Sequence, residues 1–332
     1  MRAVVLTRHG PPEVLQVQDR PDPRPGPGEL AVDVRAAGIN FADVMARMGL
    51  YMAAPKPPSV IGYEVAGTVS ALGEGVTRFA VGQRVMAGTR FGGYAERIVT
   101  RVENALPLPE RLTFEEGAAI PVNYATAAAA LVRYGNVQVG ERILVHAAAG
   151  GVGVAATQIA KARGAEIWGT ASPGKHDAIR ALGVDHPIDY TKPGWEKALP
   201  KLDLVMDAIG GRSFRQGYEL LRPGGRLVCF GASSLVQGET RSIVGAVRTL
   251  LAMPRFNLVK QMESSKVVIG LNLLALWDEF GELAAWLDPV VAMLERGPAR
   301  PVVAAAVPFA RAPEAHRILG ERRNVGKVVL TP

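Results

Sequence analysis

Cysteine is almost absent from this chain: Cys229 is its only cysteine in 332 residues. A single thiol forms no internal disulfide framework and cannot supply a multi-cysteine zinc cluster. Histidine is scarce as well, and the five histidines show no metal-ligand spacing such as H-x-x-x-H; they are His9, His146, His176, His186 and His316. We therefore expect no disulfide and no bound metal, and we interpret the histidines as capping or surface residues.

Long apolar runs and basic tracts are also missing. No uninterrupted apolar stretch reaches the roughly 20 residues that span a bilayer. The first ten residues, M-R-A-V-V-L-T-R-H-G, have too short an apolar part for a signal peptide. The net charge of +7 is dispersed, without a long Lys/Arg tract or an aromatic-rich basic surface. These absences predict a cytoplasmic protein that does not bind nucleic acid.

The hydrophobic fraction is high, at 48%, and the length suits two domains. From residue 2 to about 121, short Val-rich runs between prolines and glycines predict a compact, barrel-like β domain. From residue 123, predicted strands and helices alternate as in a parallel α/β sheet. The strands are expected at 142–146, 166–170, 203–207 and 226–230, and the helices at 151–163, 175–182 and 212–222. Residues 302–332 return to short strands around a helix at 312–321.

A glycine-rich turn joins the first strand and helix of the α/β part. The stretch I-L-V-H-A-A-A-G-G-V-G places Ala147, Gly150 and Gly153 at the spacing of a dinucleotide fingerprint, with alanine at its first position. The missing side chains let a pyrophosphate approach the amides at the helix N-terminus, where the dipole favours an anion. A plain tight strand-to-helix connection is the alternative at this point.

No acidic residue ends the second predicted strand, where NAD-binding proteins usually carry an Asp or Glu for the ribose 2′-hydroxyl. The strand leads instead into Thr170, Ser172 and Lys175. Hydroxyl groups and an ammonium suit a 2′-phosphate, which a carboxylate repels. Lys175 taken alone is better explained as a solvated surface lysine, but together with the missing acid it favours NADPH over NADH.

Four motifs along some 300 residues carry a family resemblance. They are A-A-G-I-N-F-A-D-V-M-A-R-M-G-L-Y (36–51), P-S-V-I-G-Y-E-V-A-G-T-V (58–69), V-H-A-A-A-G-G-V-G (145–153) and N-V-G-K-V-V-L (324–330). In this order they resemble the medium-chain dehydrogenase/reductase superfamily, its zinc-independent quinone oxidoreductase branch, and most closely the vesicle amine transport protein 1 homologues.

The resemblance implies an α/β protein of two domains. A GroES-like β-barrel domain over 1–122, completed by 267–332, would be catalytic, and a doubly wound Rossmann domain over 123–266 would bind NADPH. The active site would lie in the cleft between them. The resemblance also implies a homodimer joined through the edges of the Rossmann sheets.

Zinc-dependent relatives carry ligands at positions that differ here. Asn40 stands in the place of a cysteine, Tyr63 in the place of the histidine before Glu64, and Val122 near a further cysteine. These residues cannot assemble a soft tetrahedral N/S site. Without a metal, the chemistry left is hydride delivery from a reduced nicotinamide, with protein groups or water polarising or protonating the acceptor.

The resemblance assigns the catalytic segment to residues 40–51. Asn40 can both donate and accept, so it suits the nicotinamide carboxamide or ribose; a loop asparagine bonded to its own backbone is the alternative. Tyr51 occupies the place of a tyrosine proposed as proton donor in related enoyl-thioester reductases, with a rim tyrosine that shapes the pocket as the alternative. Met45 replaces a second tyrosine of quinone oxidoreductases, which makes simple quinones less secure substrates.

The same resemblance implies the cofactor contacts. The pyrophosphate would meet the glycine-rich turn, and the adenosine end would lie near Lys175 and Tyr190, the latter with a half-buried strand-end aromatic as its alternative. The full predicted set is Asn40, Thr126, Ala149, Gly150, Gly151, Val152, Gly169, Thr170, Ser172, Lys175, Tyr190, Phe230, Gly231, Ala232, Ser233, Leu271, Leu273, Asn324 and Lys327.

Residues 234–266 are longer than in shorter quinone reductases. Ile243, Val247, Leu250 and Leu251 form an apolar stripe with Arg241 and Arg248 off it, typical of a basic amphipathic helix that ends at Pro254. We expect this segment to wall the substrate cleft and favour a bulky apolar acceptor.

Three functions remain open at this stage. The first is an NADPH-dependent reductase of an activated double bond or quinone, with a small apolar electrophile such as a quinone, enone or enoyl thioester as substrate. The second is a lipid- or membrane-surface-binding protein with little or no catalysis. The third is an NADPH-binding oligomer without turnover.

Overall fold

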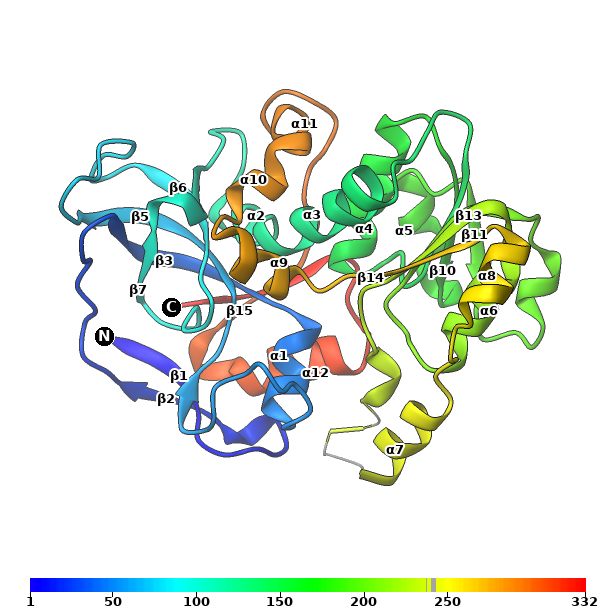
Figure 1. The fold of residues 1–332 in the computed structure, drawn as a ribbon. Coiled ribbons are helices and arrows are strands. Elements are labelled where there is room, and N and C mark those ends of the chain that lie inside the picture. Colours follow the sequence, from blue (N-terminus) through cyan, green and yellow to red (C-terminus); the bar gives the residue numbers. More distant parts are fainter. Residues whose placement is uncertain (237, 240–242) are drawn as a thin grey trace. The chain divides into compact units, whose positions relative to one another are not determined.

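The computed structural model describes residues 1–236, 238, 239 and 243–332. By internal contacts the chain divides into two compact units (Figure 1). Unit 1 comprises residues 1–125, 238–241 and 274–332, and unit 2 comprises residues 126–237 and 242–273. The domain boundaries predicted at 122/123 and 266/267 stay a prediction, and each unit is described by itself.

Unit 1 contains two sheets within the described residues. The smaller has the order β2-β1-β4, and the larger has the order β15-β16-β3-β5-β6-β8, with β7 paired to β3. The bounds are β1 (Arg2–Leu6), β2 (Leu15–Asp19), β3 (Glu29–Ile39), β4 (Ser59–Val60), β5 (Glu64–Leu72), β6 (Arg84–Gly88), β7 (Arg97–Arg101), β8 (Ala105–Pro107), β15 (Val303–Pro308) and β16 (Lys327–Thr331). All these pairings are antiparallel except β15 with β16.

β3 organises the larger sheet because it is long enough to pair with three strands. Its first half pairs with β7, its C-terminal end with β16, and nearly its whole length with β5. Alternating valines and alanines make it a buried strand, and Leu30, Val32 and Ile39 belong to the core of the unit. This strand therefore brings the C-terminal β16 beside residues from the first forty positions.

Short helices complete unit 1. They are α1 (Phe41–Arg47), α2 (Phe114–Gly117), α9 (Leu273–Phe280), α10 (Ala284–Leu287), α11 (Val291–Glu295) and α12 (Ala312–Gly320), while α3 (Pro121–Ala128) runs across the boundary after Ala125. α12 is the helix predicted at 312–321, and it packs its alanines into the core with β16 and β15. The three helices between 273 and 295 were not predicted.

Unit 2 is built on a parallel sheet with the order β11-β10-β9-β12-β13-β14. Renumbered along the chain this is 3-2-1-4-5-6, the strand order of the Rossmann fold. The strands are β9 (Arg142–Val145), β10 (Glu166–Ala171), β11 (His186–Asp189), β12 (Leu202–Asp207), β13 (Leu221–Cys229) and β14 (Val267–Gly270). The helices are α4 (Gly151–Ala162), α5 (His176–Ala181), α6 (Arg212–Leu220), α7 (Ile243–Leu251) and α8 (Leu258–Ser264).

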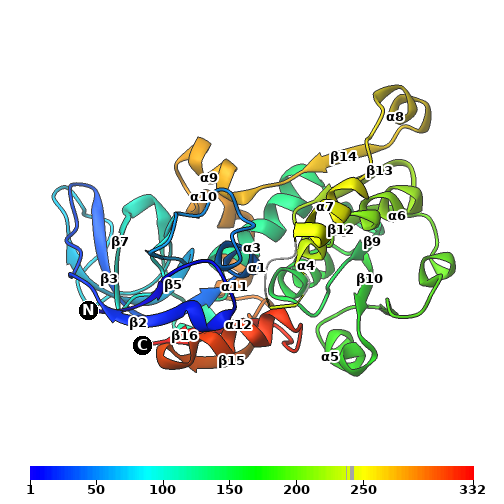
Figure 2. The ribbon, with the colours of Figure 1, turned by 90° about the horizontal axis from the view of Figure 1, so that it is seen from below.

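The structure confirms the predicted fold class and the four predicted strands of the α/β part, while β11 and β14 had been missed. β14 pairs with β13, so residues 267–270 extend the parallel sheet of unit 2. In Figure 2, α8 lies beside the start of β14, the strand that follows it in the chain. Among the described residues, no helix is both long and apolar enough to cross a bilayer.

Candidate functional site

The glycine-rich turn of unit 2 lies between β9 and α4. Ala147 has a positive φ of 53°, and the backbone returns through a bond from Gly150 N to the Ala147 carbonyl, at 2.8 Å. Gly150 is the N-cap of α4, and no side chain of the described residues caps the helix there. The amides of the first turn of α4 are therefore available to an anion.

Gly153 has to be a glycine for this turn to close. A Cβ on Gly153 would lie 2.4 Å from the Ala147 carbonyl oxygen and 2.7 Å from the Ala148 Cα atom. A Cβ on Gly150 would meet only the Ala147 carbonyl oxygen, at 3.2 Å. Gly153 thus lets the start of α4 pack against the turn, whereas the position of Gly150 is open enough for a pyrophosphate to approach the backbone.

Thr170 holds the glycine-rich turn through two hydrogen bonds to its backbone. Its side chain is buried, and its hydroxyl accepts a bond from Ala147 N at 3.1 Å, while Ala148 N donates to its carbonyl oxygen. Thr170 lies near the end of β10, so the second strand holds the glycine-rich turn in place. Its predicted contact with the adenosine end of the cofactor stays a prediction.

Asp207 and His146 form a buried pair that the sequence analysis missed. Asp207 ends β12 and accepts bonds from Ile209 N at 2.6 Å and from the Ser213 hydroxyl at 2.6 Å. His146 Nε2 lies 3.9 Å from Asp207 Oδ2, and burial lowers the pKa of this histidine. Burial likewise raises the pKa of Cys229, at the end of β13, to about 12. The sequence signal that could have identified Asp207 is the D-x-x-G-G stretch at 207–211, directly after a predicted strand. The carboxyl ends of parallel strands meet at one edge of the sheet, where ligands bind.

The other predicted cofactor residues of unit 2 lie on loops that follow its strands. Lys175 N donates to the Ser172 carbonyl in the short turn after β10, and Tyr190 is half exposed after β11. Residues 230–233 follow β13, and the amides of Phe230 and Ser233 donate to the carbonyls of Asp207 and Ala208. These positions all lie at the carboxyl edge of the sheet. Their contacts with a cofactor stay predictions.

Unit 1 brings together four polar side chains from distant segments, three of them buried and the fourth, Asn40, partly exposed. Asn40 caps α1, Glu64 begins β5, Asn123 lies in α3, and Lys327 begins β16. Strand pairing explains the meeting, since Val328 is opposite Ile39 and Glu64 is opposite Gly38. We call Asn40, Glu64, Asn123 and Lys327 the buried polar cluster.

Hydrogen bonds connect every member of the cluster. Lys327 Nζ donates to Glu64 Oε1 at 2.5 Å, to Asn40 Oδ1 at 2.7 Å and to Asn123 Oδ1 at 3.4 Å. Asn40 Nδ2 donates to Glu64 Oε1 at 2.9 Å, and Val122 N donates to Glu64 Oε2 at 2.8 Å. Glu64 and Lys327 are 0% and 3% exposed, so the ion pair is out of contact with bulk water.

Asp43 lies behind Asn40 and is fully buried. Its carboxylate accepts from Asn40 N at 2.8 Å and from Gly62 N at 3.2 Å, and burial raises its pKa to about 7. Tyr94 and His316 continue this polar layer, with the Tyr94 hydroxyl 3.5 Å from His316 Nε2. Burial lowers the pKa of His316 to about 3, and the charge of Arg47 acts in the same direction.

Tyr51 is half buried and pairs with a second aromatic side chain. Its ring stands edge-on to the Tyr63 ring, with centroids 6.4 Å apart, and Tyr63 contacts Phe91 in turn. Burial raises the pKa of the Tyr51 phenol, so the hydroxyl keeps its proton at neutral pH. The Tyr63 hydroxyl is buried and makes no hydrogen bond with the described residues.

The segment 234–266 carries exposed apolar side chains. α7 is present as predicted and ends before Pro254, with Thr249 donating its hydroxyl to the Ser234 carbonyl. Leu251 is 81% exposed and Met262 of α8 is 77% exposed, so this surface is not packed on its own unit. Arg241, which was predicted to lie off the apolar stripe, is outside the described residues.

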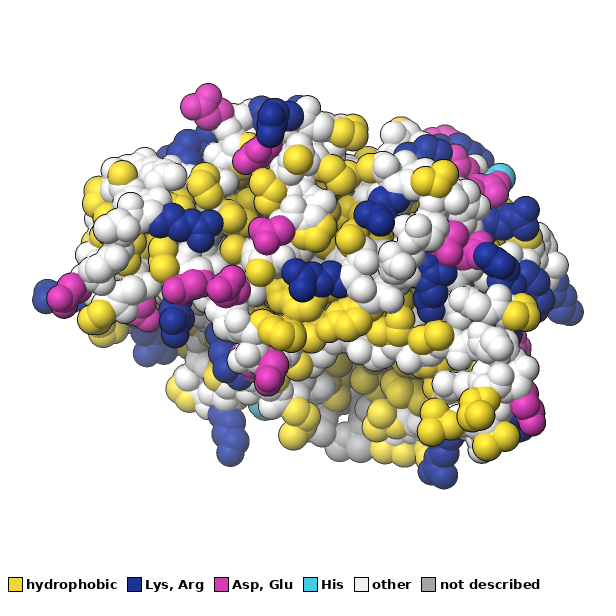
Figure 3. Space-filling model, turned by 45° about the horizontal axis from the view of Figure 1, so that its top comes forward, with side chains coloured by type: hydrophobic (Ala, Val, Ile, Leu, Met, Phe, Trp, Pro, Cys, Tyr) yellow, Lys and Arg dark blue, Asp and Glu magenta, His cyan; other side chains and the backbone are white. Residues whose placement is uncertain are grey.

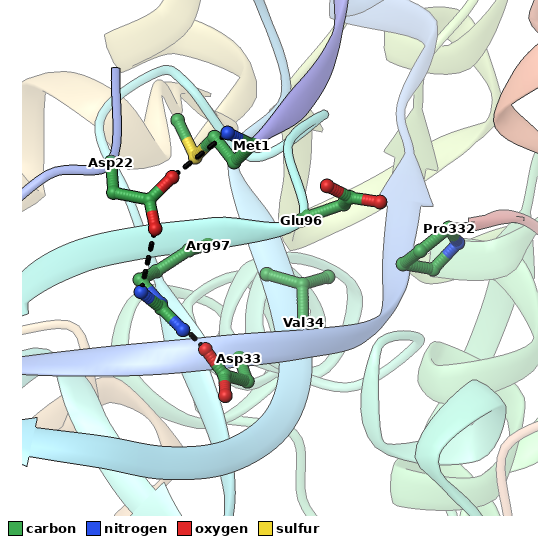
Figure 4. Close-up of a pocket in the computed structure, with 7 residues that line it drawn as sticks. All are labelled: Met1, Asp22, Asp33, Val34, Glu96, Arg97 and Pro332. Carbon is green, nitrogen blue, oxygen red and sulfur yellow. Dashed lines mark hydrogen bonds and ion pairs between the residues drawn. The ribbon is translucent and has the colours of Figure 1, made fainter. Parts of the chain in front are cut away.

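A pocket of about 340 Å³ lies elsewhere in unit 1, and its lining is charged (Figure 4). Arg97 bridges Asp22 and Asp33, and the Met1 amino group pairs with Asp22. These charges already compensate one another. On the face drawn in Figure 3, acidic and basic side chains are similarly interspersed. Within residues 1–236, 238–239 and 243–332, no three His, Cys, Asp or Glu side chains are arranged to hold a metal ion.

Family models match two parts of the chain: an alcohol dehydrogenase GroES-like domain over residues 26–110 and a zinc-binding dehydrogenase over residues 182–330. The human synaptic vesicle membrane protein VAT-1 homolog is 38% identical over 340 residues, covering 100% of this chain and 86% of that protein.

Two solved structures share the fold along the whole chain. The quinone oxidoreductase of Thermus thermophilus, solved also as its complex with NADPH, has a TM-score of 0.81 and 36% identity, covering 100% of both chains. The CurK enoyl reductase has a TM-score of 0.86 and 27% identity, covering 99% of this chain and 98% of that one.

Proposed function

Because the chain belongs to the zinc-independent quinone oxidoreductase branch of the medium-chain dehydrogenase/reductase superfamily, we propose that it is an NADPH-dependent reductase. Its substrate would be a small apolar electrophile with an activated C=C bond, or a quinone. The observation that carries the proposal is the uncapped glycine-rich turn at α4, followed by a second strand without a terminal carboxylate.

The residues of unit 2 fit a dinucleotide phosphate. The first-turn amides of α4 offer donors to a pyrophosphate, and Gly150, where a Cβ would meet a single atom at 3.2 Å, leaves the backbone open to it. Lys175 and Ser172 would hold a 2′-phosphate, because the turn at 171–175 contains no carboxylate to oppose it. The similar Thermus protein has been solved with NADPH, which supports NADPH as a cofactor of this fold.

The residues of unit 1 supply groups for the acceptor. When bound, reduced nicotinamide supplies the hydride. Tyr51 would donate the proton to the carbon α to a carbonyl or to a quinone oxygen, since its raised pKa keeps it protonated. Asn40 offers an amide N–H to an oxygen acceptor. The apolar class of substrate is supported by the quinone oxidoreductase and enoyl reductase among the similar structures.

An NADPH-oxidation screen tests this function, with enones, enoyl thioesters and ortho- and para-quinones as acceptors. Tyr51→Phe should lower kcat roughly 10²- to 10⁴-fold, as removal of a general acid does. Tyr134→Phe, at a tyrosine 42% exposed in unit 2, is the matched control. Full activity in Tyr51→Phe would assign the proton to water, and no turnover with any acceptor would refute the reductase.

Cofactor choice is tested separately by binding. Lys175→Ala should weaken NADPH roughly ten- to hundredfold, the effect of one charge-assisted hydrogen bond, and leave NADH affinity unchanged. Equal affinity of the native protein for both nucleotides would contradict the proposed role of Lys175.

A second candidate function is attachment to an anionic membrane surface. The exposed apolar side chains of α7 and α8 are accompanied between 247 and 266 by four basic residues and one acidic residue. The similarity to the human VAT-1 homolog is consistent with it. Leu251→Ser should reduce sedimentation with phosphatidylserine vesicles, whereas Val139→Ser, at a valine 84% exposed elsewhere, should not. Equal sedimentation of both variants would dismiss it.

We also infer a homodimer joined through the edge of the parallel sheet. β14 is an edge strand in the described part of the chain, and Val267 is 48% exposed. Such an edge is a template for pairing with a second copy. Light scattering should give twice the mass of the chain, and Val268→Pro should reduce it to a monomer. A monomeric native protein would contradict this.

A further inference from the structure

The buried polar cluster contains an ion pair, Lys327 with Glu64, and a buried ion pair contributes little to folding stability. Removing an ammonium and a carboxylate from water is costly, and an apolar pair of the same size is often at least as stable. Lys327 and Glu64 nevertheless lie at 3% and 0% exposure. The cluster therefore requires an explanation beyond stability.

The Lys327 ammonium makes its hydrogen bonds to the other members of the buried polar cluster. An ammonium has three N–H donors and no acceptor. The three oxygens around Nζ belong to Glu64, Asn40 and Asn123, at 2.5, 2.7 and 3.4 Å. The resemblance implies a cofactor contact by Lys327, and if that contact were made through Nζ it would have to replace one of these bonds.

Asn40 is held between opposite charges. Its Oδ1 faces the Lys327 ammonium and its Nδ2 faces the Glu64 carboxylate. Flipping the amide would set an NH2 group against the ammonium and a carbonyl oxygen against the carboxylate, and both contacts are repulsive. The orientation is therefore fixed, and Nδ2 keeps one N–H beyond its bond to Glu64.

We propose that Lys327 is a positioning residue, whose buried ammonium locks the Asn40 amide so that its remaining N–H serves as a hydrogen-bond donor. The recognised chemistry is an oxygen acceptor, on either the bound nucleotide or the electrophilic substrate. This inference rests on the proposed reductase function. It sharpens the role predicted for Asn40, because the amide oxygen already accepts from Lys327 while one N–H remains to donate.

A double-mutant cycle tests whether Lys327 acts through Asn40. Lys327→Met and Asn40→Ala should each lower kcat/KM at least tenfold, and the double variant should be no worse than Asn40→Ala alone. Independent losses that multiply would overturn the proposal. Lys161→Met, at a lysine paired with Asp185 in unit 2, is the matched control and should keep native activity.

Folding is separated from positioning by neutralising the cluster. Lys327→Met leaves Glu64 buried without its partner, whereas Lys327→Met/Glu64→Gln removes both charges. The neutral variant should have a melting temperature close to that of the native protein but stay at least tenfold impaired. Native activity in the neutral variant would overturn the proposal.

Chemical rescue identifies the ammonium itself. Ethylammonium or propylammonium should restore part of the activity of Lys327→Ala, and the corresponding alcohols should not. Equal rescue by amine and alcohol would overturn the role of the charge.

NADPH affinity and turnover, measured separately, locate the acceptor oxygen. They also distinguish a failure of the proposed reductase function from a failure of the role proposed for Lys327. A loss confined to NADPH affinity places the oxygen on the nucleotide, and a loss confined to turnover places it on the substrate. If the native protein fails to oxidise NADPH with every acceptor tried, the proposed function fails; if it turns over but the Lys327 and Asn40 effects are independent, this inference alone fails.

Discussion

The close approach at Gly153 makes a quantitative prediction about cofactor binding. In Gly153→Ala the new Cβ would lie 2.4 Å from the Ala147 carbonyl oxygen, whereas real Cβ contacts essentially never fall below 3.0 Å. Both neighbours are backbone atoms, so no flexible side chain can move aside. The turn must therefore open by at least about 0.6 Å.

That displacement is opposed by the bonds that hold the turn. Ala147 N donates to the Thr170 hydroxyl and Ala148 N to the Thr170 carbonyl, at 3.1 and 3.0 Å. Overpacking of this kind costs about 1–3 kcal/mol in stability. It also moves the first-turn amides of α4 away from the pyrophosphate, so NADPH should bind at least about tenfold more weakly, or about 1.4 kcal/mol.

Gly320→Ala, in unit 1, is the matched control, because its Cβ would meet no atom within 4 Å. NADPH affinity is measured by fluorescence titration, and the melting temperature of each variant shows that it is folded. We expect a large loss of NADPH affinity in Gly153→Ala and none in Gly320→Ala. Native NADPH affinity in a folded Gly153→Ala would refute the assignment of this turn to the pyrophosphate.

Three further predictions concern stability, each measured by chemical unfolding. Ala147→Gly should raise the free energy of unfolding by up to about 1 kcal/mol, because alanine is strained at a φ of 53° and glycine is not. A loss in this variant would contradict the strain. His316 has a pKa of about 3 in the folded state and 6.5 in the unfolded state, so the unfolded state binds more protons between these pH values. The free energy of unfolding therefore falls as the pH drops below 6.5, by up to about 1.4 kcal/mol per pH unit. His316→Gln should remove this pH dependence. Asp43 has a folded pKa of about 7 against 3.8, so the folded state holds the extra proton and stability falls as the pH rises from about 4 to 7; relative to the native protein, Asp43→Asn should gain stability over that interval. The two slopes oppose each other, so they show in the variants more clearly than in the native protein.

The fold was predictable wherever local pattern and tertiary role agree. Strands β9, β10 and β12 are largely apolar and buried, as is the C-terminal part of β13, so the apolar runs in the sequence predict them directly. β11 reads H-P-I-D and has no buried residue, because it is an edge strand of the sheet. The short helices α9 to α11 follow one another within 23 residues, and α10 and α11 have no side-chain cap from the described residues, so neither caps nor periodicity marks their ends.

The candidate site was only half predictable, for a physical reason. Motif resemblance selected Asn40 and Lys327 one at a time, as separate cofactor contacts. Their bond joins residues 287 positions apart, and the antiparallel register of β16 on β3 creates it. The same holds for Glu64, which β3 and β5 bring beside them. Such partners follow from strand register, which a single sequence does not specify over this distance.

The buried polar cluster also bears on why this chain would lack a catalytic zinc. Glu64 is retained next to the positions where zinc-dependent relatives have soft ligands, and a buried carboxylate without a cation would be strongly destabilising. Here Lys327 supplies that positive charge from within the chain, at 2.5 Å. Asn40→Cys, Tyr63→His and Val122→Cys together would leave the Lys327 ammonium beside the new ligands, where it repels a divalent ion. We expect those three substitutions to bind zinc tightly only when Lys327→Ala is added, as measured by metal content after dialysis. If the triple variant binds as much zinc with Lys327 as with Lys327→Ala, the ammonium does not stand in for the charge of a metal ion.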